Sequence, residues 1–176
     1  MKHLNDRYKL LKPLGQAGSC ISYLAQDMHD NSRVVIRQYE LEVVQTDPSR
    51  WRKRLDELRR LQHPMASSVI DFFTAKVAGS SRAHLVLSYI PGRSLAQEMR
   101  ERRLPREEIG LLIARAFGTL QEIHSQGFIH GNIKPSGVIL SKEGPRLTDF
   151  GVTGELVSIA CGYPLAMGAM GYQAPE

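Results

Sequence analysis

The sequence predicts an α+β fold in which an antiparallel sheet of five strands, with one inserted helix, precedes a mainly helical part. Two observations lead to this prediction. Short apolar runs separated by turn residues fill the chain up to residue 92, and one long amphipathic helix dominates the chain after it. We therefore expect two parts, residues 1–92 and residues 93–176, and enough chain to bury a hydrophobic core.

The first part contains five segments typical of strands, because β-branched and apolar residues alternate with polar ones between clusters of turn residues. These segments are residues 8–15, 21–28, 33–39, 68–77 and 84–90. A helix is predicted between the third and fourth segments. Asp47 suits its N-cap, Pro48 suits its first position, and the apolar residues Trp51, Leu55 and Leu58 recur at helical spacing.

The second part begins with a long helix over residues 106–126, and Gly127 is a natural stop for it. We assign its apolar stripe to the core. The stripe comprises Ile109, Leu112, Ile113, Ala116, Leu120 and Ile123. Short strands are predicted at residues 128–130, 137–140 and 146–150, with turns between them.

The composition favours a cytoplasmic protein. No apolar run approaches the roughly 18 residues that span a membrane, and the N-terminal residues lack the apolar core of a signal peptide. Cys20 and Cys161 lie far apart, which suits a reducing compartment. The net charge of +5 is concentrated at residues 49–60 and 100–107. Acidic residues interrupt both runs, so we interpret them as solvated faces and do not expect nucleic-acid binding.

Four motifs occur in order along nearly the whole chain: "LGQAGSCISYLA", "VVIR", "HGNIKPSG", and "DFG" followed by "APE". Together they resemble the glycine-rich loop, the third-strand lysine motif, the catalytic loop and the activation segment of the protein kinase family, specifically the bacterial serine/threonine type. The resemblance implies a kinase-like bilobal fold. It also implies that the chain stops after the activation segment, so that the C-terminal helices of the second lobe are absent.

The resemblance places the catalytic loop at residues that lack its chemistry. In the family an aspartate accepts the proton of the substrate hydroxyl and an asparagine five residues later binds Mg²⁺. Here these positions hold Asn132 and Gly137, while Lys134 is retained. An amide is no base near neutral pH, and a glycine offers no side-chain ligand. His130 and Phe150 match residues that in the family serve packing, so the loop is expected to preserve shape rather than chemistry.

The nucleotide site implied by the resemblance is also altered. Arg37 stands in place of the lysine that holds the phosphates, and Ala17 and Cys20 replace two glycines of the glycine-rich loop. Ser22 and Val35 replace the residues that enclose adenine. The nucleotide-binding positions carried over from the family are Gly15, Gly18, Arg37, Leu87, Tyr89 and Ile139.

Two site positions leave alternatives open. The family glutamate that pairs with the phosphate-binding lysine aligns with Arg54. Asp56 or Glu57 replaces it if the helix is rotated or if the alignment is shifted by two or three residues. Asp149 is the one carboxylate that the family uses for metal. It either binds Mg²⁺ weakly or is neutralised by Arg37 and Lys134.

These substitutions predict a pseudokinase, a regulatory or scaffolding module with weak or absent ATP binding, poor Mg²⁺ binding and little phosphotransfer. A serine/threonine kinase that uses a displaced carboxylate is the alternative. A basic module that binds nucleic acid or an acidic protein through residues 48–62 is the second. If the chain is truncated, the apolar side of the 106–126 helix remains exposed. We then expect a protein partner, or self-association through that face.

Overall fold

The structure is a computed structural model that describes residues 3–17, 20–40, 49–77, 79–148 and 150. The helix start expected at Asp47 and Pro48 lies outside these residues. The described residues form two compact units. The first comprises residues up to 60 together with residues 68–89, and the second comprises residues 61–67 and those from 90 onward. The short segment 61–67 therefore belongs to the second unit although it follows the helix of the first.

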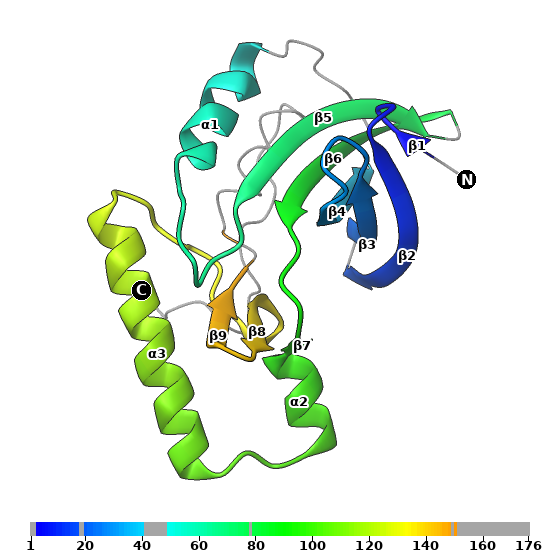
Figure 1. Ribbon diagram of the computed structural model, residues 1–176. Coiled ribbons are helices and arrows are strands. Elements are labelled where there is room, and N and C mark those ends of the chain that lie inside the picture. Colours follow the sequence, from blue (N-terminus) through cyan, green and yellow to red (C-terminus); the bar gives the residue numbers. More distant parts are fainter. Residues whose placement is uncertain (1–2, 18–19, 41–48, 78, 149, 151–176) are drawn as a thin grey trace. The chain divides into compact units, whose positions relative to one another are not determined.

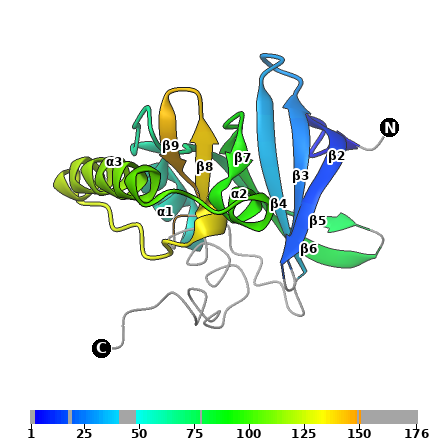
Figure 2. The same cartoon turned by 90° about the horizontal axis from the view of Figure 1, so that it is seen from below.

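The first unit is an antiparallel sheet with one helix. Its elements are β1 (His3–Leu4), β2 (Tyr8–Ala17), β3 (Cys20–Asp27), β4 (Arg33–Glu40), α1 (Ser49–Arg59), β5 (Val69–Val77) and β6 (Ser80–Ser88). The strand order is β1-β2-β3-β4-β6-β5, and β2, β3 and β4 run side by side in Figures 1 and 2. The five predicted strands are all present. The sixth strand, β1, has only two residues, too few to produce a periodic signal in the sequence.

Alternation along the strands creates the core of this unit. Val34, Ile36 and Gln38 of β4 are buried on one face, and Val35 and Arg37 lie on the other. The buried face joins a cluster that includes Tyr8, Phe73 and Val86. The ring centroids of Tyr8 and Phe73 are 5.9 Å apart, and those of Phe73 and His84 are 4.9 Å apart, so three rings from β2, β5 and β6 stack in succession.

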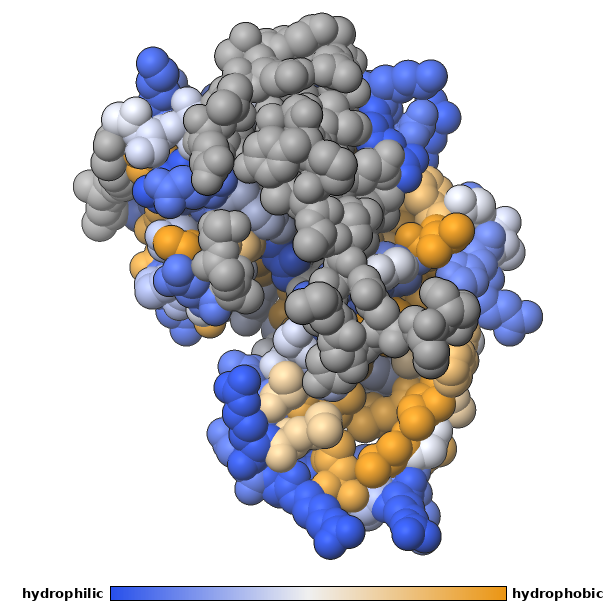
Figure 3. Space-filling model, turned by 180° about the vertical axis from the view of Figure 1, so that it is seen from behind, coloured by the Kyte–Doolittle hydropathy of each residue, from blue (hydrophilic) through white to orange (hydrophobic). Residues whose placement is uncertain are grey.

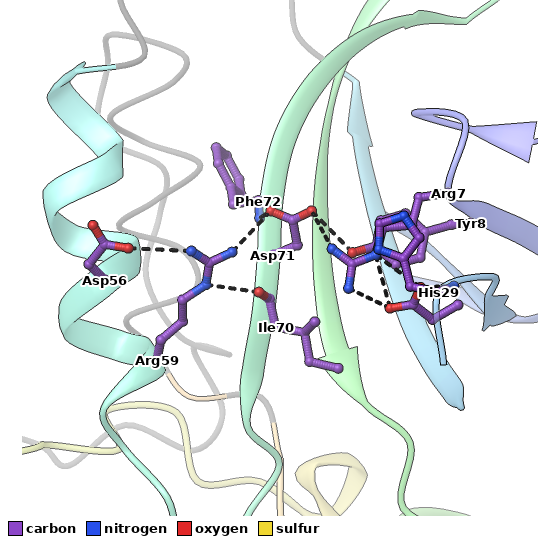
Figure 4. A network of polar contacts seen from close by, with 9 residues as sticks. Arg7, Tyr8, His29, Asp56, Arg59, Ile70, Asp71 and Phe72 are labelled. Carbon is purple, nitrogen blue, oxygen red and sulfur yellow. Dashed lines mark hydrogen bonds and ion pairs between the residues drawn. The ribbon is translucent and has the colours of Figure 1, made fainter. Parts of the chain in front are cut away.

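A polar network centred on Asp71 ties the helix and the first hairpin to β5 (Figure 4). The Asp71 carboxylate accepts a hydrogen bond of 3.1 Å from the Tyr8 hydroxyl and one of 3.4 Å from the Arg59 guanidinium. Arg59 also donates to the Ile70 carbonyl at 2.9 Å. Leu55 and Leu58 of α1 are buried. Apolar packing and the Arg59 contacts together fix how α1 is rotated about its own axis.

The second unit combines two helices with a small sheet. Its elements are β7 (Arg93–Ser94), α2 (Leu95–Glu101), α3 (Arg106–Ser125), the short 3₁₀ helix η1 (Pro135–Gly137), β8 (Val138–Ser141) and β9 (Gly144–Leu147). The sheet order is β7-β8-β9. Leu147 is fully buried, and its backbone bonds to both Met65 and Ser67. Segment 61–67 is thereby attached to β9 by backbone hydrogen bonds.

The long helix ends as predicted but buries less than predicted. Gly127 has a φ of 81°, its N–H bonds to the His124 carbonyl, and the Phe128 N–H bonds to the Ile123 carbonyl, which together form a Schellman cap. Ile109 and Ile113 are 40% and 49% exposed because they lie on the flank of the stripe rather than at its centre. The core of this unit takes its helix contacts from Ala116, Leu120 and Ile123.

Two local predictions for the second part were incomplete or wrong. Residues 128–130 form no strand: Phe128 N–H completes the helix cap, and the His130 side chain turns inward to bond to the chain near β9. The helix α2 was missed. Its signal was a capping box, in which the Ser94 side chain accepts from the Gln97 N–H and the Gln97 side chain accepts from the Ser94 N–H.

His84 is buried in the sheet, and the surrounding strands do not provide hydrogen-bond partners for its ring nitrogens. Its side chain is fully buried between strands, and within the described part of the chain neither ring nitrogen makes a hydrogen bond of good geometry. Burial lowers the pKa of His84 from 6.5 to about 4, so the ring is neutral in the folded protein at neutral pH. The unfolded chain therefore binds the proton more tightly than the folded chain does.

We expect the free energy of unfolding to fall as the pH drops from 6.5 to 4, with no contribution from His84 above this window. A shift of this size corresponds to about 3 kcal/mol. His84→Leu should remove the part of this loss that comes from His84, while buried His130, whose pKa is also lowered to about 4, keeps its own part. The substitution should also stabilise the protein at pH 7 by about 1 kcal/mol or more, because it removes unsatisfied polar atoms. Urea unfolding followed by circular dichroism between pH 4 and 8 measures both effects. The exposed His124→Leu is the control, and equal acid sensitivity in H84L and wild type would contradict the assignment.

Gly92 occupies a position that only glycine fits. Its φ is +148°, and a Cβ there would lie 2.4 Å from the Leu140 carbonyl oxygen and 2.9 Å from Ile139 Cγ2. We expect Gly92→Ala to destabilise the protein by about 2–3 kcal/mol, because the backbone of β8 must move. Thermal unfolding at low protein concentration measures the loss. Gly110→Ala is the matched control, since a Cβ at that position meets no atom within 4 Å. An unchanged melting temperature for G92A would show that β8 is not held there.

Candidate functional site

One face of the first unit's sheet gathers predicted nucleotide-binding residues. In the cross-strand register Gly15 of β2 lies opposite Ser22 of β3, Ser22 lies opposite Arg37 of β4, and Arg37 lies opposite Leu85 of β6. Residues directly opposite in an antiparallel pair share a face. The structure therefore brings Gly15 and Arg37 into one row, two strands apart.

The next row on this face contains the apolar positions. Leu24, Val35 and Leu87 lie opposite one another on β3, β4 and β6. Leu87 is 2% exposed, so it forms the closed end of this surface. Tyr89 follows β6 and its N–H bonds to the Arg33 carbonyl at 3.3 Å, which attaches the segment after β6 to β4. Arg37, Val35 and Leu87 thus form a surface that is charged at one end and apolar at the other.

Arg37 has a neighbour that the sequence interpretation missed. The Tyr39 hydroxyl forms side-chain hydrogen bonds with Cys20 and Arg37. Burial, followed by the Cys20 thiol, raises the pKa of Tyr39 above its ordinary value, so its hydroxyl stays protonated. The spacing could have indicated this contact, because residues two apart on a strand share a face and Cys20 is opposite Tyr39. Cys20 therefore belongs to a polar cluster around the arginine.

Arg54, which stands at the family's glutamate position, lies on α1 in an ion pair within the helix. Its guanidinium donates to the Glu57 carboxylate at 2.8 Å, and this contact lowers the pKa of Glu57. Asp56 faces Arg59 at 3.3 Å. Both carboxylates that could have replaced the family glutamate are therefore engaged by arginines of their own helix.

The predicted catalytic loop is organised in the second unit by His130. Its ring is 1% exposed and packs against Phe150 with ring centroids 4.3 Å apart. Nδ1 accepts the Asn132 N–H at 3.3 Å, so Nε2 carries the proton and donates to the Thr148 carbonyl at 3.0 Å. Burial lowers the pKa of His130 to about 4, which keeps this neutral tautomer at neutral pH. His130 is therefore a structural residue of the loop, as the sequence predicted for it.

The remaining predicted residues of this unit lie close along the chain. Asn132 and Lys134 are half-buried, and the Lys134 carbonyl accepts the Gly137 N–H at 2.9 Å in the turn that becomes η1. The Gly137 carbonyl accepts the Thr148 N–H at 2.8 Å. Ile139 lies on β8 between Ser94 of β7 and Arg146 of β9. The loop thus has a defined backbone, with an amide at position 132 and no side chain at position 137.

Two predicted site residues, Gly18 and Asp149, lie outside the described residues. Among the residues that are described, no group of three or more histidine, cysteine or acidic side chains could hold a metal ion. The loop position that would carry a Mg²⁺ ligand holds Gly137, which offers no side-chain oxygen to a hard cation. Arg37 fits a phosphate group by its charge.

The basic run at residues 49–60 is partly neutralised by its own acids. Arg54 pairs with Glu57, and Arg59 pairs with Asp56 and Asp71. The run at residues 100–107 includes Arg102, which contacts Glu98 and Glu108. These pairs fit solvated faces of mixed charge. No helix in the described residues is long and apolar enough to cross a membrane, and the cytoplasmic location remains a prediction.

The chain is similar to known protein kinases over its whole length. The sequence profile of the protein kinase domain matches residues 8–176. The DNA damage-responsive serine/threonine-protein kinase RqkA of Deinococcus radiodurans is 30% identical over 98% of this chain and 26% of its own length. The serine/threonine-protein kinase PknB of Mycolicibacterium smegmatis is 29% identical over 86% of this chain and 25% of its own length. MAP3K epsilon protein kinase 1 of Brassica napus is 28% identical over 99% of this chain and 14% of its own length.

This chain therefore spans about a quarter or less of the length of these relatives. The match to the kinase domain nevertheless covers nearly all of it, and the antiparallel sheet with one helix and the ordered loop after α3 agree with the kinase-like fold predicted from the motifs. The chain belongs to the protein kinase family.

Proposed function

We propose that this chain is a pseudokinase, a kinase-fold module that binds or regulates a partner, with weak nucleotide affinity and little phosphotransfer. One observation carries the proposal. The catalytic loop keeps its supporting contacts from His130 to the Asn132 backbone and from Gly137 to Thr148, but the side chain at position 132 is an amide. A well-supported loop without a base favours a role in shape over a role in chemistry.

The absence of these catalytic side chains is expected to raise the barrier to phosphotransfer substantially. A positioned general base contributes typically 10²–10⁴-fold to the rate, which corresponds to about 3–5 kcal/mol of barrier. The His130 ring does not replace it, because its burial and lowered pKa leave no accessible basic nitrogen: Nδ1 already accepts the Asn132 N–H. Gly137 adds the loss of a metal-ligand side chain, although such losses do not simply multiply.

The alternative of an active kinase requires a displaced carboxylate from α1, and the contacts of the helix disfavour it. Successive residues of an α-helix are about 100° apart around its axis. Asp56 and Glu57 follow Arg54 by two and three residues, so the helix must turn about its axis to bring either carboxylate to the position of Arg54. Such a rotation removes Leu55 and Leu58 from the core at a cost of about 1.5–3 kcal/mol each. It also breaks the bonds from Arg59 to Ile70 and Asp71.

The sheet face around Arg37 supports weak nucleotide binding, because some of its residues favour a nucleotide and others restrict its approach. Arg37 keeps a positive charge in the row that contains Gly15, and Leu87 keeps an apolar end. Against this, Tyr39 and Cys20 hold side-chain contacts around the arginine, and an arginine fork is bulkier than the ammonium it replaces. The charge attracts phosphate, while the surrounding side chains restrict how closely it approaches.

The basic stretch of α1 provides less support for a nucleic-acid module. Two of its arginines are held by acids of the same unit, and Arg59 is directed to β5. A phosphate-binding face gains affinity from cations that are free to meet phosphates. A binding partner of this module is therefore expected to recognise the kinase-like shape rather than the charge of α1.

Phosphotransfer is expected to be at least about 10³-fold below the 1–100 per second that kinases reach. The reason is the amide at position 132 together with the missing ligand at position 137. Purified protein is incubated with radiolabelled ATP, Mg²⁺ or Mn²⁺, and generic protein substrates. Asp149→Ala is the control for contaminating kinases. Transfer by the wild type that disappears in D149A would mean that the chain is an active kinase.

ATP is expected to bind with a dissociation constant no tighter than about 0.1 mM, nearly independent of Mg²⁺. The physical reason is that Arg37 supplies charge for phosphate whereas the loop lacks the ligands that would hold the metal. Calorimetry with Mg²⁺ and with EDTA measures this directly. Arg37→Ala should abolish the binding, and Arg33→Ala, at the exposed start of the same strand, should not. A tenfold or greater tightening by Mg²⁺ would reveal a working cation site and contradict the prediction.

A further inference from the structure

The Tyr39 hydroxyl is a neighbour of Arg37 on the nucleotide face, which is the side of the first unit's sheet that carries Arg37 and Leu87. On β3 and β4, Cys20 lies opposite Tyr39, in the row next to the pair formed by Ser22 and Arg37. The Tyr39 hydroxyl forms side-chain hydrogen bonds with both Cys20 and Arg37. A guanidinium can only donate, so the Tyr39 oxygen accepts the bond from Arg37. The hydroxyl therefore links Cys20, the first residue of β3, to the arginine.

A phosphate group bound on this face would have the same two neighbours. In protein kinases the glycine-rich loop covers the phosphates, and the cation of the third strand contacts them. In this chain Cys20 stands at the end of that loop, and Arg37 stands at the place of the cation. The Tyr39 oxygen thus accepts a hydrogen bond from the group that a phosphate oxygen would use.

The hydroxyl is a weaker partner for the arginine than a phosphate is. Burial keeps the pKa of Tyr39 above its ordinary value, so the hydroxyl carries no charge at neutral pH. A hydrogen bond between two ionised groups adds the attraction of opposite charges, which a neutral hydroxyl does not supply. A phosphate can therefore displace the hydroxyl, but it must first break an existing contact.

Orientation, rather than the number of donors, makes the two partners compete. A guanidinium has five N–H donors in one rigid plane, and it binds phosphate best through two parallel N–H groups. The bond to Tyr39 fixes the direction of that plane. A phosphate that takes two N–H groups must turn the guanidinium, and the Tyr39 hydroxyl then keeps only the Cys20 thiol, which is a weak hydrogen-bonding partner.

The composition of this cluster suits a charged ligand. In Figure 3 apolar side chains gather over the part of the molecule where α3 lies, in the second unit. The cluster in the first unit instead presents a guanidinium, a hydroxyl and a thiol, and its three residues are each half-buried. Half-buried polar groups of this kind fit the oxygens of a phosphate chain better than they fit an apolar ligand.

We propose that Tyr39 is a specificity-determining residue of the nucleotide face, whose hydroxyl competes with the phosphate groups of a nucleotide for Arg37. This inference rests on the proposed function, because it concerns the same weak nucleotide site. It assigns the weakness of that site to one removable oxygen atom. The competition acts on ligands that carry phosphate and spares ligands that carry none.

Calorimetry of the whole chain in EDTA, with ATP and with adenosine as ligands, tests the proposal. Tyr39→Phe keeps the ring but removes the competing oxygen. It should tighten ATP binding at least about tenfold, because a hydrogen bond to a charged group typically contributes this much to an equilibrium constant. Adenosine binding should not change, since adenosine has no phosphate for Arg37. Tyr23→Phe is the matched control: Tyr23 is also half-buried but lies opposite Ile36, on the other face, so both affinities should stay the same.

The double variant separates this competition from a change in the shape of the site. Tyr39→Phe combined with Arg37→Ala should bind ATP no better than Arg37→Ala alone, because the partner of the phosphate is gone. Thermal unfolding checks that each variant is folded. The inference is overturned if Y39F binds ATP no more tightly than the wild type, including the case in which neither binds measurably. A gain that adenosine shares, or that persists without Arg37, would overturn it as well.

Failure of this inference differs from failure of the proposed function. If Y39F does not tighten ATP binding, the pseudokinase proposal still stands, because it rests on the amide at position 132. If the wild type transfers phosphate and D149A does not, the pseudokinase proposal fails, while the effect of Tyr39 on ATP affinity is measured in the same way.

Discussion

The neutral imidazole of His130 is the contact on which the loop of the second unit depends. Through Nδ1 it holds the Asn132 N–H, and through Nε2–H it holds the Thr148 carbonyl, eighteen residues later in the chain. Both bonds require one tautomer, and burial secures it by keeping the ring uncharged. The loop and the strand end that precedes Asp149 are thus held together by a group that takes no part in phosphoryl transfer. A chain can therefore lose the base beside this histidine without losing the architecture of the loop.

In the first unit too, the side chains that hold the elements together are different from those of the nucleotide face. Asp71 is the common partner of Tyr8, Arg59 and, at 3.9 Å, Arg7. Arg7 in turn is held by Asp27, which is almost fully buried, through contacts of 2.6 to 3.0 Å. The guanidinium lowers the pKa of Asp27, so this carboxylate is charged when the protein is folded. These contacts hold the first hairpin and α1 against β5 without using any residue of the nucleotide face.

The fold was predictable to the extent that periodic patterns and motifs report it. Alternation identified five strands, and Gly127 identified the end of α3, because both depend on local geometry. The two-residue strand β1 left no pattern, and residues 128–130 resembled a strand although their polar groups complete a helix cap and support a loop. Ile109 and Ile113 were assigned to the core because a stripe of apolar residues does not tell which part of it a neighbour covers.

The candidate site was predictable in its residues but not in its contacts. Motif alignment located Arg37, Asn132 and Gly137, since each stands at a fixed offset from residues that keep the family pattern. It did not reveal the cluster of Tyr39 and Cys20 around Arg37, because side-chain hydrogen bonds across strands depend on register. It also left open whether Glu57 could replace Arg54, which is a question of how the helix is rotated and what it buries.

That question bears on what kind of module the chain is. In an active kinase an ion pair between a strand lysine and a helix glutamate must form before the site is complete, so the position of the helix responds to the state of the site. Here Arg54 is occupied by Glu57 within the helix, and Arg59 fixes α1 to β5 through Ile70 and Asp71. The position of α1 is then set by packing and by these contacts, without the strand-to-helix ion pair. A helix anchored in this way gives a partner a constant surface, which serves binding better than it serves regulated catalysis.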